Sequence, residues 1–197
     1  MTGLIILAAG ASSRLGMPKQ NLLFNGKTLL QHSVDNALAS VCSKVIVVLG
    51  ANTALIDPLK THPNLLVTHN AEWAEGMGAS IRRGLTTLLN TEPRSDSVVL
   101  MLCDQPFADT PLINNLAATS ESSAKSIIAC TYENTVGPPA LFNRMHFDEL
   151  LRLTGNEGAK KLLLKYQQQV QTIPFALGSV DIDTTSDYDG LLREKSE

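Results

Sequence analysis

Short, unbroken aliphatic runs are the feature of this sequence that most constrains its fold. They occur as LIILA (4–8), VIVVL (45–49), LLV (65–67), VVLML (98–102) and IIA (127–129). Runs of this length without alternating polar residues are typical of strands that are buried on both faces of a sheet. A parallel sheet with helices packed on each face provides that environment.

Segments with helical spacing separate these runs. Apolar residues recur every three or four positions across 30–41, 81–89, 147–151 and 159–166. A further helix start is predicted at DTP (109–111), because a capping side chain precedes a proline suited to the first turn. The alternation of strands and helices predicts an α/β protein of three layers with a mostly parallel central sheet.

Length and composition favour a single domain that spans residues 1–197. The chain is 44% hydrophobic and 18% charged, which fits a globular protein large enough to bury a core. Its net charge of −3 argues against a nucleic acid or an anionic membrane as partner. No run approaches the roughly 18 apolar residues of a membrane span.

The first residues and the cysteines predict a cytoplasmic protein. MTGLIILAAG (1–10) has no basic residue before its apolar run, so we expect a first strand here rather than a secretory signal. The three cysteines are odd in number and form no CxxC pair. This pattern disfavours both a disulfide framework and a zinc site, and it suits a reducing compartment.

The exit of the first strand, LAAGASSRLGMPKQ (7–20), is unusual. In open parallel sheets, ligands bind beyond the carboxyl ends of the strands. Small residues around Gly10 allow a ligand to approach the backbone, and Ser13 and the nearby amides can donate hydrogen bonds. Arg14 and Lys19 add positive charge. A polyphosphate is the simplest ligand for such a loop.

The spacing of this loop differs from known phosphate-binding motifs. Gly10 and Gly16 are separated by five residues, and Lys19 lies further on, so neither G-x₄-G-K-[ST] nor G-x-G-x-x-G is present. A simple Gly/Ala turn flanked by two solvated cations is the alternative interpretation.

Carboxylates follow two of the predicted strands. Asp104 comes directly after the run 98–102, where an isolated charge is unfavourable unless it is paired or binds a metal. DIDTTSD (181–187) follows an apparent strand, VQTIPF (170–175). If the sheet brings Asp104 and Asp183 together, they form a site for Mg²⁺. Alternatively, Asp104 caps a turn and the later aspartates cap the last helix.

Taken in order, these motifs resemble the MobA-like NTP transferases, the molybdenum cofactor nucleotidyltransferase family, and most closely its cytidylyltransferase branch. The resemblance runs from residue 4 to about residue 190, and it rests on LAAGASSRLGMPKQ, CDQPF (103–107), GPPALF (137–142), GNEGAKKLL (155–163) and DIDTTSDY (181–188). It implies a Rossmann-like, GT-A-like nucleotidyltransferase fold.

The resemblance also assigns roles to individual residues. It implies that Arg14, Lys19 and Asp104 are catalytic, and that Asp104 and Asp183 bind Mg²⁺, with Asp181 as a weaker candidate. Met77 is expected to border the base or the pterin substrate, and Trp73 to pack in the core. The implied nucleotide-binding residues are Ala8, Ala9, Gly10, Ser13, Arg14, Lys19, Asn70, Gly76 and Ser80.

The implied reaction joins CTP to the molybdenum cofactor. The terminal phosphate of metal-bound molybdopterin attacks the α-phosphate of CTP, and pyrophosphate leaves. Because this nucleophile is already an anion, positioning and charge neutralisation by Mg²⁺, Arg14 and Lys19 are sufficient. Implied partners are the two substrates and, transiently, a molybdoenzyme or its cofactor chaperone.

Other functions stay open at this stage. Pro138 and Asn156 depart from the family pattern and leave open which pterin species binds. CDQPF differs from the HDAARP motif of the isoprenoid cytidylyltransferases, and Ala9 differs from the LAGG opening of guanylyltransferases. The remaining alternatives are a guanylyltransferase of the same fold that acts on molybdopterin, a transferase that acts on a sugar or alditol phosphate, and a nucleotide-binding cofactor chaperone without catalysis.

Overall fold

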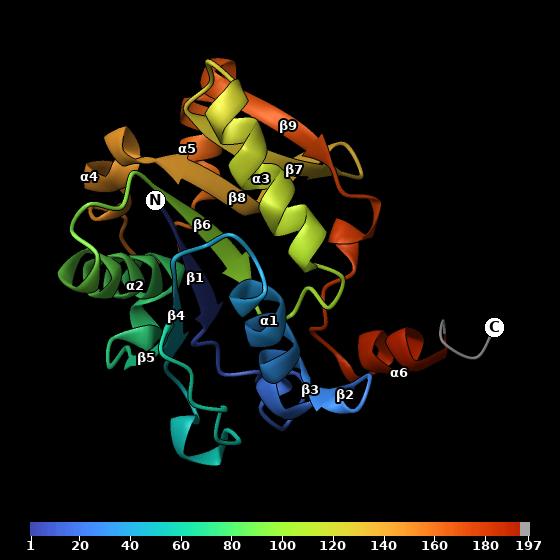
Figure 1. Ribbon diagram of the computed structural model, residues 1–197. Coiled ribbons are helices and arrows are strands. Elements are labelled where there is room, and N and C mark those ends of the chain that lie inside the picture. Colours follow the sequence, from blue (N-terminus) through green and yellow to red (C-terminus); the bar gives the residue numbers. More distant parts are fainter. Residues whose placement is uncertain (194–197) are drawn as a thin grey trace.

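One mixed sheet organises the chain, and the computed structural model describes residues 1–193 (Figure 1). The strand order is β5-β4-β1-β6-β8-β7-β9, and β2 (Leu23–Phe24) and β3 (Lys27–Thr28) form a separate hairpin. The strands of the main sheet are β1 (Thr2–Ala8), β4 (Lys44–Leu49), β5 (Leu65–His69), β6 (Ser97–Leu102), β7 (Ile127–Tyr132), β8 (Thr135–Asn143) and β9 (Val170–Pro174).

The predicted mostly parallel sheet is confirmed. β1 pairs in parallel with β4 and β6, β4 with β5, and β7 with β9. All five aliphatic runs and the VQTIPF segment contribute to these strands. The expectation of burial on both faces was wrong for LLV, because β5 is an edge strand in which Val67 is exposed. β8 alone is antiparallel to its neighbours in this sheet, β6 and β7.

β8 is a strand that the sequence pattern did not predict. It contains the GPPALF motif, and prolines disfavour a central strand because they have no N–H to donate. The ladder accommodates them through a register shift: Ala129 pairs with Ala140, but Cys130 pairs with Gly137. Pro138 and Pro139 therefore lie at an irregularity in the strand pairing, where neither is paired with a residue of β7.

Helices cover both faces of the sheet, which confirms the three-layer prediction. α1 and α3 pack on one face, and α2, α4 and α5 pack on the other (Figure 1). The helices are α1 (Leu29–Leu38), α2 (Met77–Thr91), α3 (Thr110–Ser122), α4 (Phe147–Leu150), α5 (Lys160–Lys165) and α6 (Thr185–Arg193).

The boundaries of α3 and α1 follow from local chemistry. Asp109 Oδ1 accepts a hydrogen bond from the Leu112 amide at 2.9 Å, and proline occupies the first turn of α3 as predicted. α1 ends at Leu38, so the prediction that helical spacing continues to Val41 was wrong. Just beyond the helix, Ser40 Oγ donates a hydrogen bond to the Ala37 carbonyl. Val41, which follows, is exposed.

The parallel strands β1, β4, β5 and β6 end at the same edge of the sheet. This edge brings together the segments 9–20, 50–52, 70–76 and 103–107, which lie far apart in the sequence. Across residues 1–193, the helices are too short or too polar to cross a bilayer.

Candidate active site

A cavity of about 600 Å³ lies at the carboxyl ends of β1 and β6. This volume suits a small-molecule ligand. Among the site residues predicted from sequence, those that line the cavity are Ala8, Ala9, Gly10, Lys19, Gly76, Ser80, Asp104, Asp181 and Asp183, together with Met77.

Carbonyl groups at the end of β1 and in the loop after it accept hydrogen bonds from other parts of the protein. Gln20 Nε2 donates to the Ala8 carbonyl at 2.7 Å and to the Gly10 carbonyl at 3.4 Å. The amide of Ala51 donates to the Ala9 carbonyl at 3.1 Å. With its acceptors already satisfied, the loop presents a small-residue backbone to the cavity, which suits a ligand rich in acceptor oxygens.

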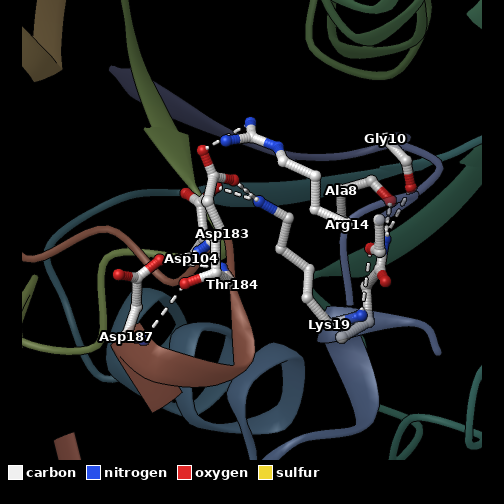
Figure 2. Close-up of polar contacts among 10 residues, drawn as sticks. Ala8, Gly10, Arg14, Lys19, Asp104, Asp183, Thr184 and Asp187 are labelled. Carbon is white, nitrogen blue, oxygen red and sulfur yellow. Dashed lines mark hydrogen bonds and ion pairs between the residues drawn. The ribbon is translucent and has the colours of Figure 1, made fainter. Parts of the chain in front are cut away.

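Lys19 lies between the two predicted metal ligands, as Figure 2 shows. Its Nζ donates to Asp104 Oδ2 at 2.6 Å and to Asp183 Oδ1 at 2.8 Å, and Arg14 donates to Asp183 Oδ2 at 3.0 Å. The Lys19 side chain is only 12% exposed. Its burial would lower its pKa, but the two carboxylates outweigh burial and raise the pKa above the ordinary lysine value.

The structure separates the aspartates into different roles. Asp187 Oδ2 accepts hydrogen bonds from the Asp183 and Thr184 amides, and the Asp187 amide donates to Thr184 Oγ1 (Figure 2). Thr184 therefore caps α6, and Asp187 completes a capping box at the start of this helix. Asp183 instead directs its carboxylate to Lys19, and its pKa is lowered by that hydrogen bond. The Asp104 side chain also pairs with Lys19, so the turn-cap interpretation of Asp104 was wrong.

Asp181 is the third carboxylate of this edge. It lines the cavity beside Asp104 and Asp183, whose negative charges act on it. Partial burial, followed by these two charges, raises the pKa of Asp181 to about 6. The cavity therefore concentrates negative charge that Lys19 and Arg14 neutralise only in part.

A divalent cation fits this group of oxygens. Asp104 Oδ1 is buried and has no hydrogen-bond partner within the part of the chain that the structure describes, so one oxygen is left for a ligand. Those same residues contain no preformed cluster of three or more metal-ligating side chains. Mg²⁺ commonly takes only one or two carboxylates and completes its shell with water and phosphate oxygens.

Three of the residues implied by the resemblance lie outside the cavity wall. The Arg14 side chain is 68% exposed and reaches the site through Asp183, and Ser13 is exposed on the loop. Asn70 is buried and donates to Ser80 Oγ at 3.1 Å. Asn70 lines a second hollow of about 400 Å³ instead.

Trp73 and Gln20 are among the residues of the cavity wall that were not assigned to it from sequence. Trp73 lines the cavity and is 38% exposed, so the prediction that it packs in the core was wrong. It lies in a short 3₁₀ turn before α2, where local periodicity gives no orientation. Gln20 follows Lys19 directly and is buried, with its Oε1 lacking a partner within residues 1–193.

The 155–158 loop packs on the first turn of α2. The Gly78 amide donates to the Gly155 carbonyl at 3.2 Å, and Asn156 lines the cavity beside Gly76. Gly76 has φ +120°, and a Cβ at this position would collide with the Gly155 backbone. Glycine at position 76 therefore allows the two segments to meet.

Cys103 is unsuited to act as a nucleophile. It is buried next to Asp104, and burial followed by that negative charge raises the pKa of its thiol to about 12. This agrees with the prediction that Cys103 is a small buried residue. The chemistry of the cavity consequently rests on charged groups and backbone amides.

A family model describes most of this chain. Residues 4–170 match the MobA-like NTP transferase domain. The chain belongs to this family. The match includes the loop after β1 and Asp104, although the aspartates at 181 and 183 lie beyond its end.

Known relatives span nearly the whole chain. Purine catabolism protein PucB of Bacillus subtilis is 29% identical and covers 98% of this chain and 96% of its own length. The molybdenum cofactor cytidylyltransferase of Escherichia coli is 25% identical over 93% of this chain and 92% of that protein. Nicotine blue oxidoreductase of Paenarthrobacter nicotinovorans is 28% identical over 95% of each. Family members thus carry several different names.

Solved structures agree with the fold. Rv0371c from Mycobacterium tuberculosis has a TM-score of 0.81 and 32% identity, with 98% of each chain covered. A complex of that protein with manganese has a TM-score of 0.77 and 28% identity, again with 98% of each chain covered. The chain therefore has the nucleotidyltransferase fold of this family, and one structural neighbour binds a divalent metal.

Proposed function

We propose that this protein transfers CMP from CTP to the terminal phosphate of molybdenum-bound molybdopterin and releases pyrophosphate. The observation that carries the proposal is the Lys19–Asp104–Asp183 cluster beside the loop after β1, in one cavity. The similarity to the cytidylyltransferase of Escherichia coli supports the choice of nucleotide and acceptor.

The protein's own residues have clear tasks in this proposal. The backbone after β1 binds the triphosphate, and Lys19 and Arg14 leave their carboxylate partners to neutralise its charge. The attacking phosphate is an anion, so no residue has to remove a proton from it. Residues 8–10 and the first turn of α2 hold the nucleotide in line for attack.

Asp104 and Asp183 would hold Mg²⁺, with Asp181 nearby. The ion, when bound, would stabilise negative charge on the transferring phosphate and on pyrophosphate. The buried, unpartnered Asp104 Oδ1 supports this assignment. Lys19 lies between the two carboxylates, so an ion held by Asp104 and Asp183 would share these oxygens with the Lys19 ammonium group.

A pyrophosphate-release assay with each NTP and purified molybdenum cofactor tests the proposal. We expect release that requires CTP, the cofactor and Mg²⁺ together. Release with a sugar phosphate in place of the cofactor, or no release with any NTP, would contradict it.

The choice of CTP leads to a separate prediction. Ala9 and its small neighbours are proposed to leave space suited to a pyrimidine, so CTP should outcompete GTP and ATP in the same assay. Competition kinetics that favour a purine nucleotide would move the protein to the guanylyl or adenylyl branch.

A further inference from the structure

Trp73 is a large aromatic residue that has no aromatic or cationic partner for its ring within the described part of the chain. Of the large apolar residues that are exposed there, only Trp73 and Met77 line the cavity. An indole left open inside a concave site is suited to receive a planar ring.

The backbone holds Trp73 next to the loop after β1. A Cβ built on Gly50 would lie 2.6 Å from Trp73 Cβ and 2.8 Å from Ala9 Cβ. Because Gly50 has no side chain, the turn that carries Trp73 packs directly against the backbone between β4 and β1. Trp73 is thus fixed beside Ala9, on the wall of the cavity that the loop after β1 forms.

Met77 extends the same apolar surface. It lies four residues after Trp73, in the first turn of α2, and is 42% exposed. A thioether adapts its shape to a flat ring and makes favourable contacts with aromatic systems. Its sulfur also lies close to Gly158, where an added Cβ would be 2.8 Å away, so Met77 packs against the 155–158 loop at the cavity wall.

We infer that Trp73, supported by Met77, is the stacking surface for the base of the nucleotide. This inference rests on the proposed nucleotide binding at the same site and adds the residue that recognises the ring. Stacking on an aromatic ring tolerates different bases, so Trp73 supplies affinity for the ring, while neighbouring groups choose the base.

Trp73 is the single tryptophan of the chain, so its own fluorescence reports on the contact. The wild-type protein is titrated with CTP, cytidine, inorganic tripolyphosphate and a soluble pterin, each with Mg²⁺ present. We expect CTP and cytidine to quench the emission and tripolyphosphate to leave it unchanged. Quenching by the pterin without quenching by cytidine would overturn the assignment to the base.

Two substitutions test the energetic contribution. Trp73→Ala should weaken CTP binding, measured by calorimetry, by roughly 5- to 150-fold, and Trp73→Phe should retain it within about threefold. Tripolyphosphate should bind both variants as it binds the wild type. Leu164→Ala is the matched control, since Leu164 is 66% exposed and lies outside the cavity wall.

The outcomes separate this inference from the proposed function. If CTP binds Trp73→Ala as tightly as the wild type, the stacking role is wrong while nucleotide binding stands. If the wild type binds GTP instead of CTP and Trp73→Ala weakens GTP, stacking stands and the cytidylyl assignment fails. If no nucleotide binds the wild type, both fail.

Discussion

Buried polar groups at the amino ends of the parallel strands (the amino edge) differ in their hydrogen bonding from those at the carboxyl ends (the carboxyl edge). At the amino edge, Ser126 Oγ donates to Gln169 Oε1 at 2.7 Å and accepts from His146 Nε2 at 2.8 Å. At the carboxyl edge, the Lys19 side chain lies between two carboxylates, and Asp104 Oδ1 has no partner within the described residues. The polar side chains at the amino edge are hydrogen-bonded to one another, whereas the cluster at the carboxyl edge contains an acceptor oxygen without a partner among the described residues.

This difference distinguishes a structural polar cluster from one suited to a ligand. His146 and Ser126 are 2% and 7% exposed, and neither lines the cavity at the carboxyl edge or the second hollow. Burial lowers the pKa of His146, which keeps the ring neutral within its hydrogen bonds. The carboxyl edge carries charge beside a cavity, where each ion pair is available for exchange with a charged ligand.

Asp104→Asn should produce the largest effect, at the carboxyl edge. Turnover should fall about a hundredfold or more, because the charge that holds Mg²⁺ against the triphosphate is removed. The free energy of unfolding should change little, because Lys19 keeps Asp183 as a partner and is not left as an unpaired buried charge. Turnover against Mg²⁺ concentration, together with a thermal melt, measures both.

The same substitution at Asp109 is the control for this experiment. Asp109 also follows β6, but it caps α3, and asparagine is an equally good cap. Asp109→Asn should leave turnover and stability unchanged. Normal turnover of Asp104→Asn at low Mg²⁺ would mean that the two edges do not differ as we describe.

Lys19→Ala should weaken triphosphate binding about ten- to a hundredfold, because a charge-assisted contact contributes roughly 1.5–3 kcal/mol. Binding of the free nucleoside should change little. Mn²⁺ binding without nucleotide should become tighter, since the cation between Asp104 and Asp183 is gone. Calorimetry with CTP, cytidine and Mn²⁺ measures the three affinities.

Lys27→Ala is the matched control, since Lys27 pairs with Asp35 on the surface at 2.5 Å, away from the cavity. An equal loss of affinity for CTP and cytidine in Lys19→Ala would place Lys19 away from the phosphates.

Ser126→Ala should show the reverse pattern at the amino edge. The free energy of unfolding should fall by about 1–3 kcal/mol, because His146 and Gln169 lose their shared partner. Turnover should equal that of the wild type. Chemical denaturation and the pyrophosphate assay check this, and a loss of turnover without a loss of stability would refute the comparison.

Asp181→Asn should produce the smallest effect, one that depends on pH. The ordinary pKa of this carboxyl is 3.8 and the folded value is about 6, so the folded state binds the proton more tightly. Ionisation therefore costs stability above about pH 6, and this cost is relieved as the pH falls toward 4. The variant should be more stable than the wild type at neutral pH, and the difference should shrink on acidification.

Denaturant titrations of both proteins, from neutral pH down to about pH 4, measure this difference. A gap between the two proteins that stays constant across the range would show that the Asp181 charge is not strained in the folded protein.

Strands that are buried on both faces were the most predictable part of the fold. Such a strand is recognised by one property, a short run of aliphatic residues without polar ones, and this property can be read from a few consecutive residues. β8 was missed because its two prolines break the local pattern, and the register shift between β7 and β8 that accommodates them involves both strands.

The candidate site was predicted less evenly. Asp104 followed from its position at the end of an apolar run, Lys19 from the small-residue loop after the first strand, and Asp183 from the acidic cluster after VQTIPF. The resemblance then assigned roles to them. The insertion of Lys19 between the two carboxylates was not predicted, because the partners lie 85 and 164 residues away along the chain. The exposed position of Trp73 was missed for a similar reason, since packing against Gly50 sets it.

By itself, the sequence determined the parallel three-layer architecture, the family, and the strand exits that carry charge, because apolar runs and short motifs act over a few residues. The tertiary structure decided which charges meet, which aspartate completes a helix cap and which faces the cavity, and which aromatic ring stays open. These outcomes depend on distances between strand ends, and such distances exist only once the sheet has brought distant segments together.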